Sequence, residues 1–284
     1  MVAVTDAVTD LADEQLLAAA RRGDRPALEA LLERQQSRVF RFGMKMCRNP
    51  EDAKDILQET LLAMARTVRD FRGASSISTW LYTIARSFCI KKRRRSKFAP
   101  AVESSLEGAV DRAAERVPSP AVGPEEELAG RQVEQALEQA IASLRPMYRE
   151  VMVLRDVEGL PAAEVAQVLG LTVDAVKTRL HRARLMVRDK VAPLLGVTVT
   201  APRSGQRRRC PDVLRTLSRY LEGEISSNVC ARMEKHVREC PPCGDACDSL
   251  KRVLALCQAA PEPQVPAEIQ DSVRQVVRQL LDRP

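Results

Sequence analysis

The sequence predicts an all-α protein in which two helical domains, joined by a flexible linker, are followed by a small helical metal-binding domain. Two observations predict the helical class. Aromatic residues make up only 3% of the 284 residues, and apolar side chains recur every three or four positions rather than alternating as in a strand. A third observation sets the end of the chain apart, since six of the eight cysteines follow residue 209. The predicted boundaries are 1–98 and 128–195 for the two domains, 99–127 for an acidic linker, 196–209 for a connector and 210–284 for the C-terminal domain.

Composition restricts the partners and the compartment. A net charge of +7 is compatible with a polyanionic partner. No apolar run approaches the roughly 18 residues needed to cross a bilayer, and the acidic N-terminus lacks the basic region of a signal peptide. We therefore expect a cytoplasmic protein without a membrane partner, in which cysteines are thiols or metal ligands rather than disulfides.

The first domain is expected to contain three helices before its basic end. The first ends at Gly23, and Asp24 caps the second. The third begins at the Asn49–Pro50 pair and carries one continuous apolar face. Four polar side chains fall off that face: Asp52, Asp55, Gln58 and Glu59. By residue type alone, such a surface is more typical of a solvated helix than of a docking site.

An aromatic and strongly basic stretch, residues 71–97, closes the first domain. It contains the only tryptophan, Trp80, and ends in a dense run of lysine and arginine. Aromatic rings replace the stacking of extruded bases and cations neutralise phosphates, so this composition indicates contact with nucleic acid. The candidate side chains are Phe71, Arg72, Trp80, Tyr82, Arg86, Lys91, Lys92, Arg93, Arg94 and Arg95. The alternative is the core stripe of an amphipathic helix, because apolar residues from Ile77 to Phe88 are three or four apart.

Two blocks of this domain, EDAKDILQETLLAMAR and FRGASSISTWLYTIARSFCIKKRRR, resemble the promoter-melting domain of the extracytoplasmic-function (ECF) sigma factors of bacterial RNA polymerase. The resemblance covers residues 24–97. It implies that the four polar side chains of the third helix dock on core RNA polymerase. It also implies that the aromatic and basic candidates of 71–95 read and open the upstream melted element of promoter DNA.

The predicted linker differs in composition from both neighbours. It is rich in proline, and its seven acidic residues against Arg112 and Arg116 give a net charge of −5. These features predict a flexible spacer. The resemblance to ECF sigma factors implies that this linker runs through the template and RNA channels of the polymerase.

Residues 161–190, PAAEVAQVLGLTVDAVKTRLHRARLMVRDK, predict two short helices joined by a tight turn at Gly170, with Thr172 as the cap of the second. The outer face of the second helix is basic, which predicts a helix-turn-helix whose recognition helix enters the major groove. The candidate DNA contacts are Lys177, Thr178, His181, Arg182 and Arg184. A basic surface helix in a bundle is the alternative. This segment, in this position, resembles the ECF sigma domain that reads the distal promoter element.

The cysteine-rich tail contains a His-x3-Cys-x2-Cys core at His236, Cys240 and Cys243. Two side chains four residues apart on one helix and a third after a Pro-Pro turn can converge on one tetrahedral ion. Cys210 completes a Cys3His set for zinc, and Cys230 is the competing fourth ligand. Two further cysteines, 247 and 257, are expected to pack in the core of a later helix, with a soft-metal or redox role as the alternative.

Cys210, the YLEGEIS turn, His236, Cys240 and Cys243 resemble the zinc-binding domain of anti-sigma factors, which bind a sigma factor and hold it off polymerase. The tail therefore predicts an intramolecular contact with the sigma-like domains, which either inhibits or supports activity. Residues 266–282 form a last amphipathic segment that either caps the tail or covers another domain.

The sequence contains no catalytic constellation or phosphate-binding glycine loop, so we do not expect an enzyme. We predict an ECF-type sigma factor that binds core polymerase, recognises and helps to melt a promoter, and is regulated in cis by a metal- or redox-responsive tail. The alternatives are a helix-turn-helix regulator that senses metal or redox state without acting as a sigma factor, and a sensor that acts by protein contact.

Overall fold

The computed structural model describes residues 13–98, 124–196, 210–259 and 264–281. Within these ranges the regular structure is helical throughout and contains no strand, which confirms the predicted all-α class. The chain divides into two compact units, one formed by residues 1–118 with 261–284 and the other by residues 119–260. The predicted C-terminal domain is thus shared between the two units. Most of the predicted linker and connector lies outside the described residues.

The first unit is built on three helices after a short helical segment at 13–21: α2 (Arg25–Cys47), α3 (Pro50–Thr67) with the short η1 (Val68–Asp70), and α4 (Ile77–Phe98). The predicted caps are present. The Asp24 carboxylate accepts a hydrogen bond from the Ala27 amide at 3.0 Å, and the Asn49 side chain accepts one from the Glu51 amide at 2.9 Å. A side chain at Gly43 would meet the Ala53 Cα at 3.0 Å, so glycine lets α2 and α3 approach closely.

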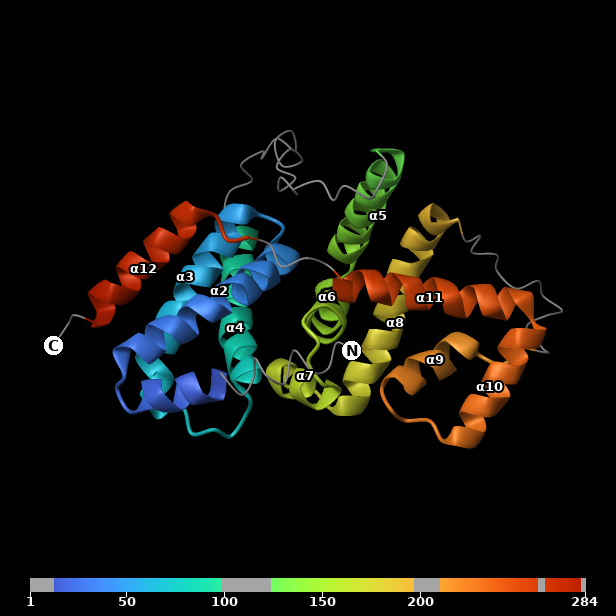
Figure 1. Ribbon diagram of the computed structural model, residues 1–284, viewed down its shortest axis with the longest axis horizontal. Helices are drawn as coiled ribbons and strands as arrows, with labels where there is room; N and C mark the ends of the chain where they lie inside the picture. The colour runs from blue at the N-terminus through green and yellow to red at the C-terminus, as the bar shows by residue number, and fades with distance from the viewer. Residues whose placement is uncertain (1–12, 99–123, 197–209, 260–263, 282–284) are drawn as a thin grey trace. The chain divides into compact units, whose positions relative to one another are not determined.

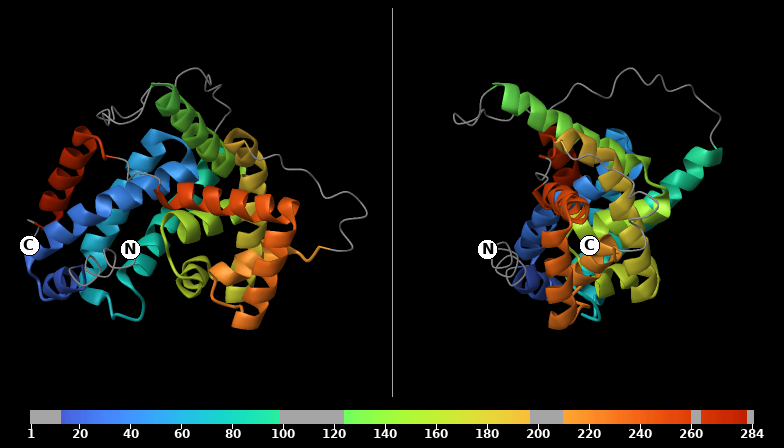
Figure 2. Two further views of the ribbon diagram at one scale, coloured as in Figure 1. Left: turned by 45° about the vertical axis from the view of Figure 1, so that its right-hand side comes forward. Right: turned by 90° about the vertical axis from the view of Figure 1, so that its right-hand side faces the viewer.

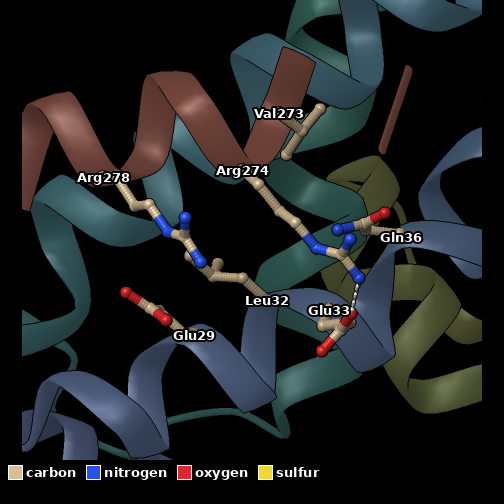
Figure 3. A pocket seen from close by; sticks show the side chains of 7 residues that line it. All are labelled: Glu29, Leu32, Glu33, Gln36, Val273, Arg274 and Arg278. Atoms are coloured by element: carbon tan, nitrogen blue, oxygen red, sulfur yellow. Dashed lines mark hydrogen bonds and ion pairs between the residues drawn. The ribbon is translucent and has the colours of Figure 1, made fainter. Parts of the chain in front are cut away.

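The last helix, α12 (Ala267–Leu281), packs on α3 and α2 of the first unit (Figure 1). Its Ile269 and Val273 are buried. Arg274 forms an ion pair with Glu33 of α2. Figure 3 shows Arg274 and Arg278 reaching toward Glu33 and Glu29 beside a hollow of about 280 Å³. Of the two predicted places for this amphipathic segment, it therefore takes the one that covers another domain.

The second unit begins with α5 (Pro124–Ser143), α6 (Pro146–Met152) and a π-helical stretch, η2 (Val153–Val157). The helix-turn-helix follows as α7 (Ala162–Leu169) and α8 (Val173–Val191), which ends in η3 (Ala192–Leu195). Gly170 makes the turn with φ +64°, and the Thr172 hydroxyl accepts a hydrogen bond from the Ala175 amide at 3.2 Å. These are the turn and the cap that the sequence predicts. Leu180 and Val187 on the inner face of α8 are fully buried.

Three tail helices complete the second unit: α9 (Val213–Leu221), α10 (Ser227–Glu239) and α11 (Pro241–Ala259). Helices α9 and α11 both contact α8, and the views in Figure 2 agree with Figure 1 in placing α11 beside it. Cys247 and Cys257 are buried on the packed face of α11 with Leu250 and Val253, as the core interpretation predicts. Among the described helices, none is both long enough and apolar enough to span a membrane.

Candidate metal centre and nucleic-acid interface

Four side chains of the tail converge at the junction of α10 and α11. One ligand atom each from Cys210, His236, Cys240 and Cys243 lies within 4.8 Å of all the others. The Cys210 and Cys240 sulfurs are 3.9 Å apart, and the His236 Nε2 lies 3.3 Å from the Cys243 sulfur. The structure thus brings together the predicted set with Cys210 as its fourth member, and Cys230 lies outside this group.

The local fold explains how these side chains meet. Helix α10 is capped by Cys240, whose amide donates to the His236 carbonyl at 2.9 Å. The Cys243 amide donates in turn to the Cys240 carbonyl at 3.0 Å, which closes the turn at the start of α11. A side chain at Gly244 would meet the Val237 carbonyl oxygen at 3.2 Å, so a small residue is needed where α11 begins against α10.

The donor set fits a tetrahedral zinc ion. Zinc lies about 2.3 Å from sulfur and about 2.0–2.1 Å from nitrogen, which places the ligand atoms of a tetrahedron about 3.6–3.8 Å apart. The observed separations of 3.3 and 3.9 Å bracket this range. Burial, followed by the Cys240 and Cys210 thiols, raises the pKa of Cys243 to about 12, whereas a hydrogen bond from the Cys243 amide lowers the pKa of Cys240. A bound cation would supply the positive charge that stabilises these closely spaced thiols as thiolates.

The recognition helix α8 is in contact with α9 and with the turn that follows it. Lys177 forms an ion pair with Glu224, and the His181 Nδ1 lies 3.0 Å from the Ser218 hydroxyl. Arg188, further along α8, donates to the Ser249 hydroxyl of α11 at 2.7 Å. Polar groups of the tail therefore occupy the outer face of the helix that the sequence assigns to DNA.

A buried charge cluster lies at the centre of this contact. Arg184 donates to both carboxylate oxygens of Asp156, at 2.9 and 2.6 Å, and to the Glu222 Oε1 at 2.9 Å. The other Glu222 oxygen accepts from the Arg155 Nε at 3.0 Å. The Arg184, Asp156 and Glu222 side chains are only 2%, 4% and 5% exposed. A charge so deeply buried is tolerated only when it is paired, as it is here.

A hollow of about 370 Å³ adjoins the cluster between α8 and the α9 turn. Every sequence-predicted DNA contact of the second domain lines it: Lys177, Thr178, His181, Arg182 and Arg184. The tail contributes three carboxylates and two cations to the lining: Asp212, Glu222, Glu224, Arg215 and Arg219. The structure therefore unites the five predicted side chains on one surface, and that surface is opposed by carboxylates.

In the first unit the aromatic candidates separate into two groups. The Phe71 and Trp80 rings lie 4.7 Å apart between centroids and are half-buried. Tyr82 is only 1% exposed and packs on Phe42 of α2, with ring centroids 5.4 Å apart. Tyr82 therefore belongs to the core, where its ring has no free face for a base.

The basic candidates of the first unit lie on α4 and in the segment before it. Arg72 and Arg94 are exposed, Arg86 and Arg93 are half-buried, and the Lys91 ammonium lies 5.0 Å from the centre of the Phe88 ring. The Arg95 side chain lies outside the described residues. Basic side chains thus follow α4 toward its end.

Lys92 joins the predicted DNA surface to the predicted polymerase surface. It forms ion pairs with Asp55 and, at 3.2 Å, with Asp52. A hollow of about 430 Å³ beside it is lined by Asp55, Gln58 and Glu59 of α3 and by Phe88 and Lys91 of α4. The acidic and basic candidates of the first unit are therefore neighbours.

Three residues of the interface were missed by the sequence analysis. Arg155 lies outside the helix-turn-helix, and Glu222 and Glu224 belong to the YLEGEIS turn, which by itself names no binding partner. Arg155 and Glu222, which pair with each other, are 67 residues apart in the sequence, and no helical periodicity indicates a contact over that distance. The spacing of the two glutamates around Gly223 was the only available signal.

Comparisons with known proteins match three segments of the chain. The family model for Sigma-70 region 2 covers residues 31–98, that for Sigma-70, region 4 covers residues 134–187, and a zinc-finger family model covers residues 210–244. The three matches coincide with the aromatic and basic stretch and α3, with the helix-turn-helix, and with the Cys/His cluster.

The curated relatives extend over the first two matches together. RNA polymerase sigma factor YlaC of Bacillus subtilis is 31% identical over 168 residues, which cover 59% of this chain and 93% of the relative. ECF RNA polymerase sigma factor SigM of Mycobacterium tuberculosis is 32% identical over 187 residues, covering 65% and 85%. RNA polymerase sigma-H factor of Pseudomonas aeruginosa is 28% identical over 192 residues, covering 66% and 98%. Between 34% and 41% of this chain therefore lies outside these matches, which cover 85–98% of the relatives.

Proposed function

Because this chain belongs to the ECF sigma factors of bacterial RNA polymerase, we propose that its C-terminal domain regulates promoter recognition in cis by covering the recognition helix α8. Family membership makes the protein a transcription initiation factor. The alternative of a helix-turn-helix regulator that is not a sigma factor does not account for the match to Sigma-70 region 2. The specific assignments of residues, metal and regulation below are parts of this proposal.

The first unit engages core polymerase and the melted promoter. Asp52, Asp55, Gln58 and Glu59 form the polymerase-binding face of α3, and its support is the hollow that three of them line. The Phe71 and Trp80 rings provide a stacking surface for an extruded base, while the cations from Arg72 to Arg94 hold the phosphates. Tyr82 is not included because it is buried.

The second unit reads the distal promoter element through α8, with Lys177, Thr178, His181 and Arg182 as base or phosphate contacts. In the closed form these side chains face α9 and its turn. The observation that carries the proposal is the insertion of the Glu222 carboxylate between Arg184 and Arg155 of the DNA-binding domain. DNA and the tail cannot occupy this surface together.

Zinc bound by Cys210, His236, Cys240 and Cys243 would fix the tail in its docking shape. A structural zinc ion contributes folding free energy because its ligands are deprotonated thiolates and a neutral imidazole. In this chain Cys210 precedes α9, while the other three ligands tie α10 to α11. Loss of the ion, or oxidation of its thiols, would release α9 and its two glutamates from α8.

Run-off transcription with core polymerase tests the proposal. The full chain is compared with a chain ending at Leu195, each with zinc and with a chelator. We expect the short chain to initiate in both conditions, and the full chain to initiate well only when the metal is removed. Equal activity of the two chains in both conditions would refute regulation by the tail. Failure of both chains to initiate, in the presence of active polymerase, would contradict the proposed roles of the first unit.

A further inference from the structure

We infer that the Glu222–Gly223–Glu224 turn acts as a surrogate for DNA phosphates, and that its carboxylates occupy cation sites of the helix-turn-helix domain which hold promoter phosphodiesters in the open protein. The inference rests on the proposed closure of the tail over α8 and states the chemistry by which it closes. It adds Arg155, which lies outside the helix-turn-helix, to the phosphate-binding residues.

The contacts of Glu222 are those of a small oxyanion. Each of its two oxygens accepts from a different guanidinium, at 2.9 Å from the Arg184 Nη2 and 3.0 Å from the Arg155 Nε. Arginine pairs with carboxylate and with phosphate in the same forked geometry, so a site built for one accepts the other. Glu224 fills a second site, on the Lys177 ammonium, which lowers the pKa of the Glu224 carboxyl.

The turn holds the two carboxylates toward one partner surface. Gly223 has φ +71°, in the left-handed region that glycine adopts without strain. The Gly223 amide donates to the Tyr220 carbonyl at 2.9 Å, and the Glu224 amide donates to the Arg219 carbonyl at 3.0 Å. The end of α9 is therefore anchored, and both acids meet cations of the DNA-binding domain.

Oppositely charged groups meet across the contact. On the DNA-binding domain, the three cations Lys177, Arg155 and Arg184 face one anion, Asp156, and leave a net charge of +2. Glu222 and Glu224 supply −2, while Arg219 of α9, whose Nε lies 3.5 Å from the Glu224 Oε2, is a cation of the tail at the same place. When the tail leaves, the same surface carries two uncompensated positive charges, which is the condition for phosphate binding by counterion release.

One donor of the buried cluster is not used in the closed form. Within the described residues, the Arg184 Nη1 is buried and has no hydrogen-bond partner. Glu222 accepts from the Arg184 Nη2 and the Arg155 Nε but makes no hydrogen bond to this third nitrogen. Arg184 also lines the hollow of about 370 Å³ beside the cluster. A phosphodiester that replaces Glu222 would offer this remaining donor an additional acceptor oxygen.

The test uses the full, zinc-loaded chain and a promoter duplex, with affinity measured at several salt concentrations. Glu222→Gln with Glu224→Gln keeps the shape of the turn and removes its charge. We expect promoter affinity to rise about tenfold or more, since truncating a buried charged partner weakens an interface by at least that factor. The salt dependence should also steepen, because salt helps to open the wild-type turn but no longer has this effect in the variant. Glu239→Gln, an exposed acid of α10, is the matched control and should change neither quantity.

A second arm asks whether the uncovered cations bind DNA. Arg155→Gln is added to the double glutamine variant, which is already open. Promoter affinity should fall, and the slope of log affinity against log salt should decrease by about one, as expected for the loss of one phosphate contact. Zinc content and the thermal unfolding midpoint are measured for every variant, so that loss of folding is recognised.

The outcomes separate this inference from the proposal on which it rests. If the chain ending at Leu195 binds the promoter more tightly but the double glutamine variant does not, the tail covers α8 without depending on the charge of Glu222 and Glu224. The inference that this turn replaces DNA phosphates is then wrong. It is equally wrong if the double variant opens and Arg155→Gln then has no effect. If millimolar inorganic phosphate, at constant ionic strength, opens the wild-type chain, the site belongs to a free anion and not to DNA.

Discussion

The two candidate DNA-binding surfaces are both basic and both neutralised by carboxylates, but those carboxylates come from different sources. On the first unit, Lys92 of α4 pairs with Asp52 and Asp55 of α3, its neighbour in the same domain. On the second unit, cations of α8 and η2 pair with Glu222 and Glu224. Those two glutamates belong to the segment matched by a separate zinc-finger family.

The source of the carboxylates determines which of the two surfaces regulation can act on. The pairing on the first unit is exposed, with the Lys92 and Asp55 side chains 33% and 55% accessible, so solvent and salt weaken it at all times. The pairing on the second unit is buried and depends on a domain whose shape a metal would fix. Under the proposed regulation, the tail would cover and uncover the second surface, whereas the carboxylates on the first surface belong to the same domain as their cation.

Breaking the metal cluster should have the largest effect. Cys243→Ala removes a buried ligand, and a structural zinc site contributes on the order of 10 kcal/mol to the folding of a small domain. We expect bound zinc to fall to near zero, amide exchange to become fast in α9 to α11, and promoter binding to rise. Zinc content and hydrogen exchange measure the result. Cys230→Ser should keep its zinc, and retention of zinc by Cys243→Ala would remove this cluster as the metal site.

Removing one partner from a buried ion pair should lower the free energy of unfolding more than removing one partner from an exposed ion pair. Arg184→Gln leaves Asp156 buried without its cation and should lower the free energy of unfolding of the second unit by about 3–5 kcal/mol. Lys92→Gln, on the exposed surface, should cost no more than about 1 kcal/mol. Urea denaturation measures both. Similar losses for the two variants would show that burial does not distinguish the surfaces.

The aromatic pair offers the next largest effect, on promoter opening and not on stability. Trp80→Ala should weaken opening by about 1–3 kcal/mol, the contribution of stacking one base, because its half-buried ring lies beside Phe71. Fluorescence of 2-aminopurine placed in the upstream melted element reports the change. Tyr220→Ala removes an exposed ring of the second unit and should leave opening by a zinc-free chain unaltered.

The smallest expected effect concerns His181. Burial lowers the pKa of its imidazole; Asp212 opposes this shift, and Arg215, Arg184 and Arg182 reinforce it. Docking of the tail on α8 therefore favours the neutral imidazole of His181 over the charged one. Docking is fully stable above the free histidine pKa of about 6.5 and weakens as the pH falls below it. Promoter binding should therefore increase modestly from about pH 7.5 to pH 5.5, and His181→Gln should reduce this increase. Comparing the two proteins cancels the contribution of His236, and identical pH profiles would exclude His181 as the titrating group.

The local features of the fold could be predicted from the sequence, whereas its pairings across domains could not. Gly170, Thr172 and the caps at Asp24 and Asn49 act within a few residues, so their chemistry identifies them directly. The four candidate metal ligands could be predicted because their spacing and donor types are restrictive. The helical period placed Ile269 on an apolar face but could not show that α2 and α3 would receive it.

Tyr82 and Arg155 both show that the spacing of residues in the sequence does not reveal contacts between distant segments. Tyr82 lies next to a basic run and was assigned to DNA, yet its ring packs on Phe42, a contact with another helix that spacing does not reveal. Arg155 stands outside any motif and becomes part of the candidate site only through Glu222. Burial and long-range charge pairing decide both cases, and both are properties of the folded chain.

Because Glu222 and Arg184 belong to one polypeptide, the covering group and its target are always present in a ratio of one to one. An intramolecular contact does not depend on protein concentration, so dilution or overproduction leaves the closed fraction unchanged. A regulator on a separate chain would be outnumbered whenever its target was made in excess. Under the proposed regulation every copy would respond on its own, and the transcriptional output would follow the fraction of tails that have been released.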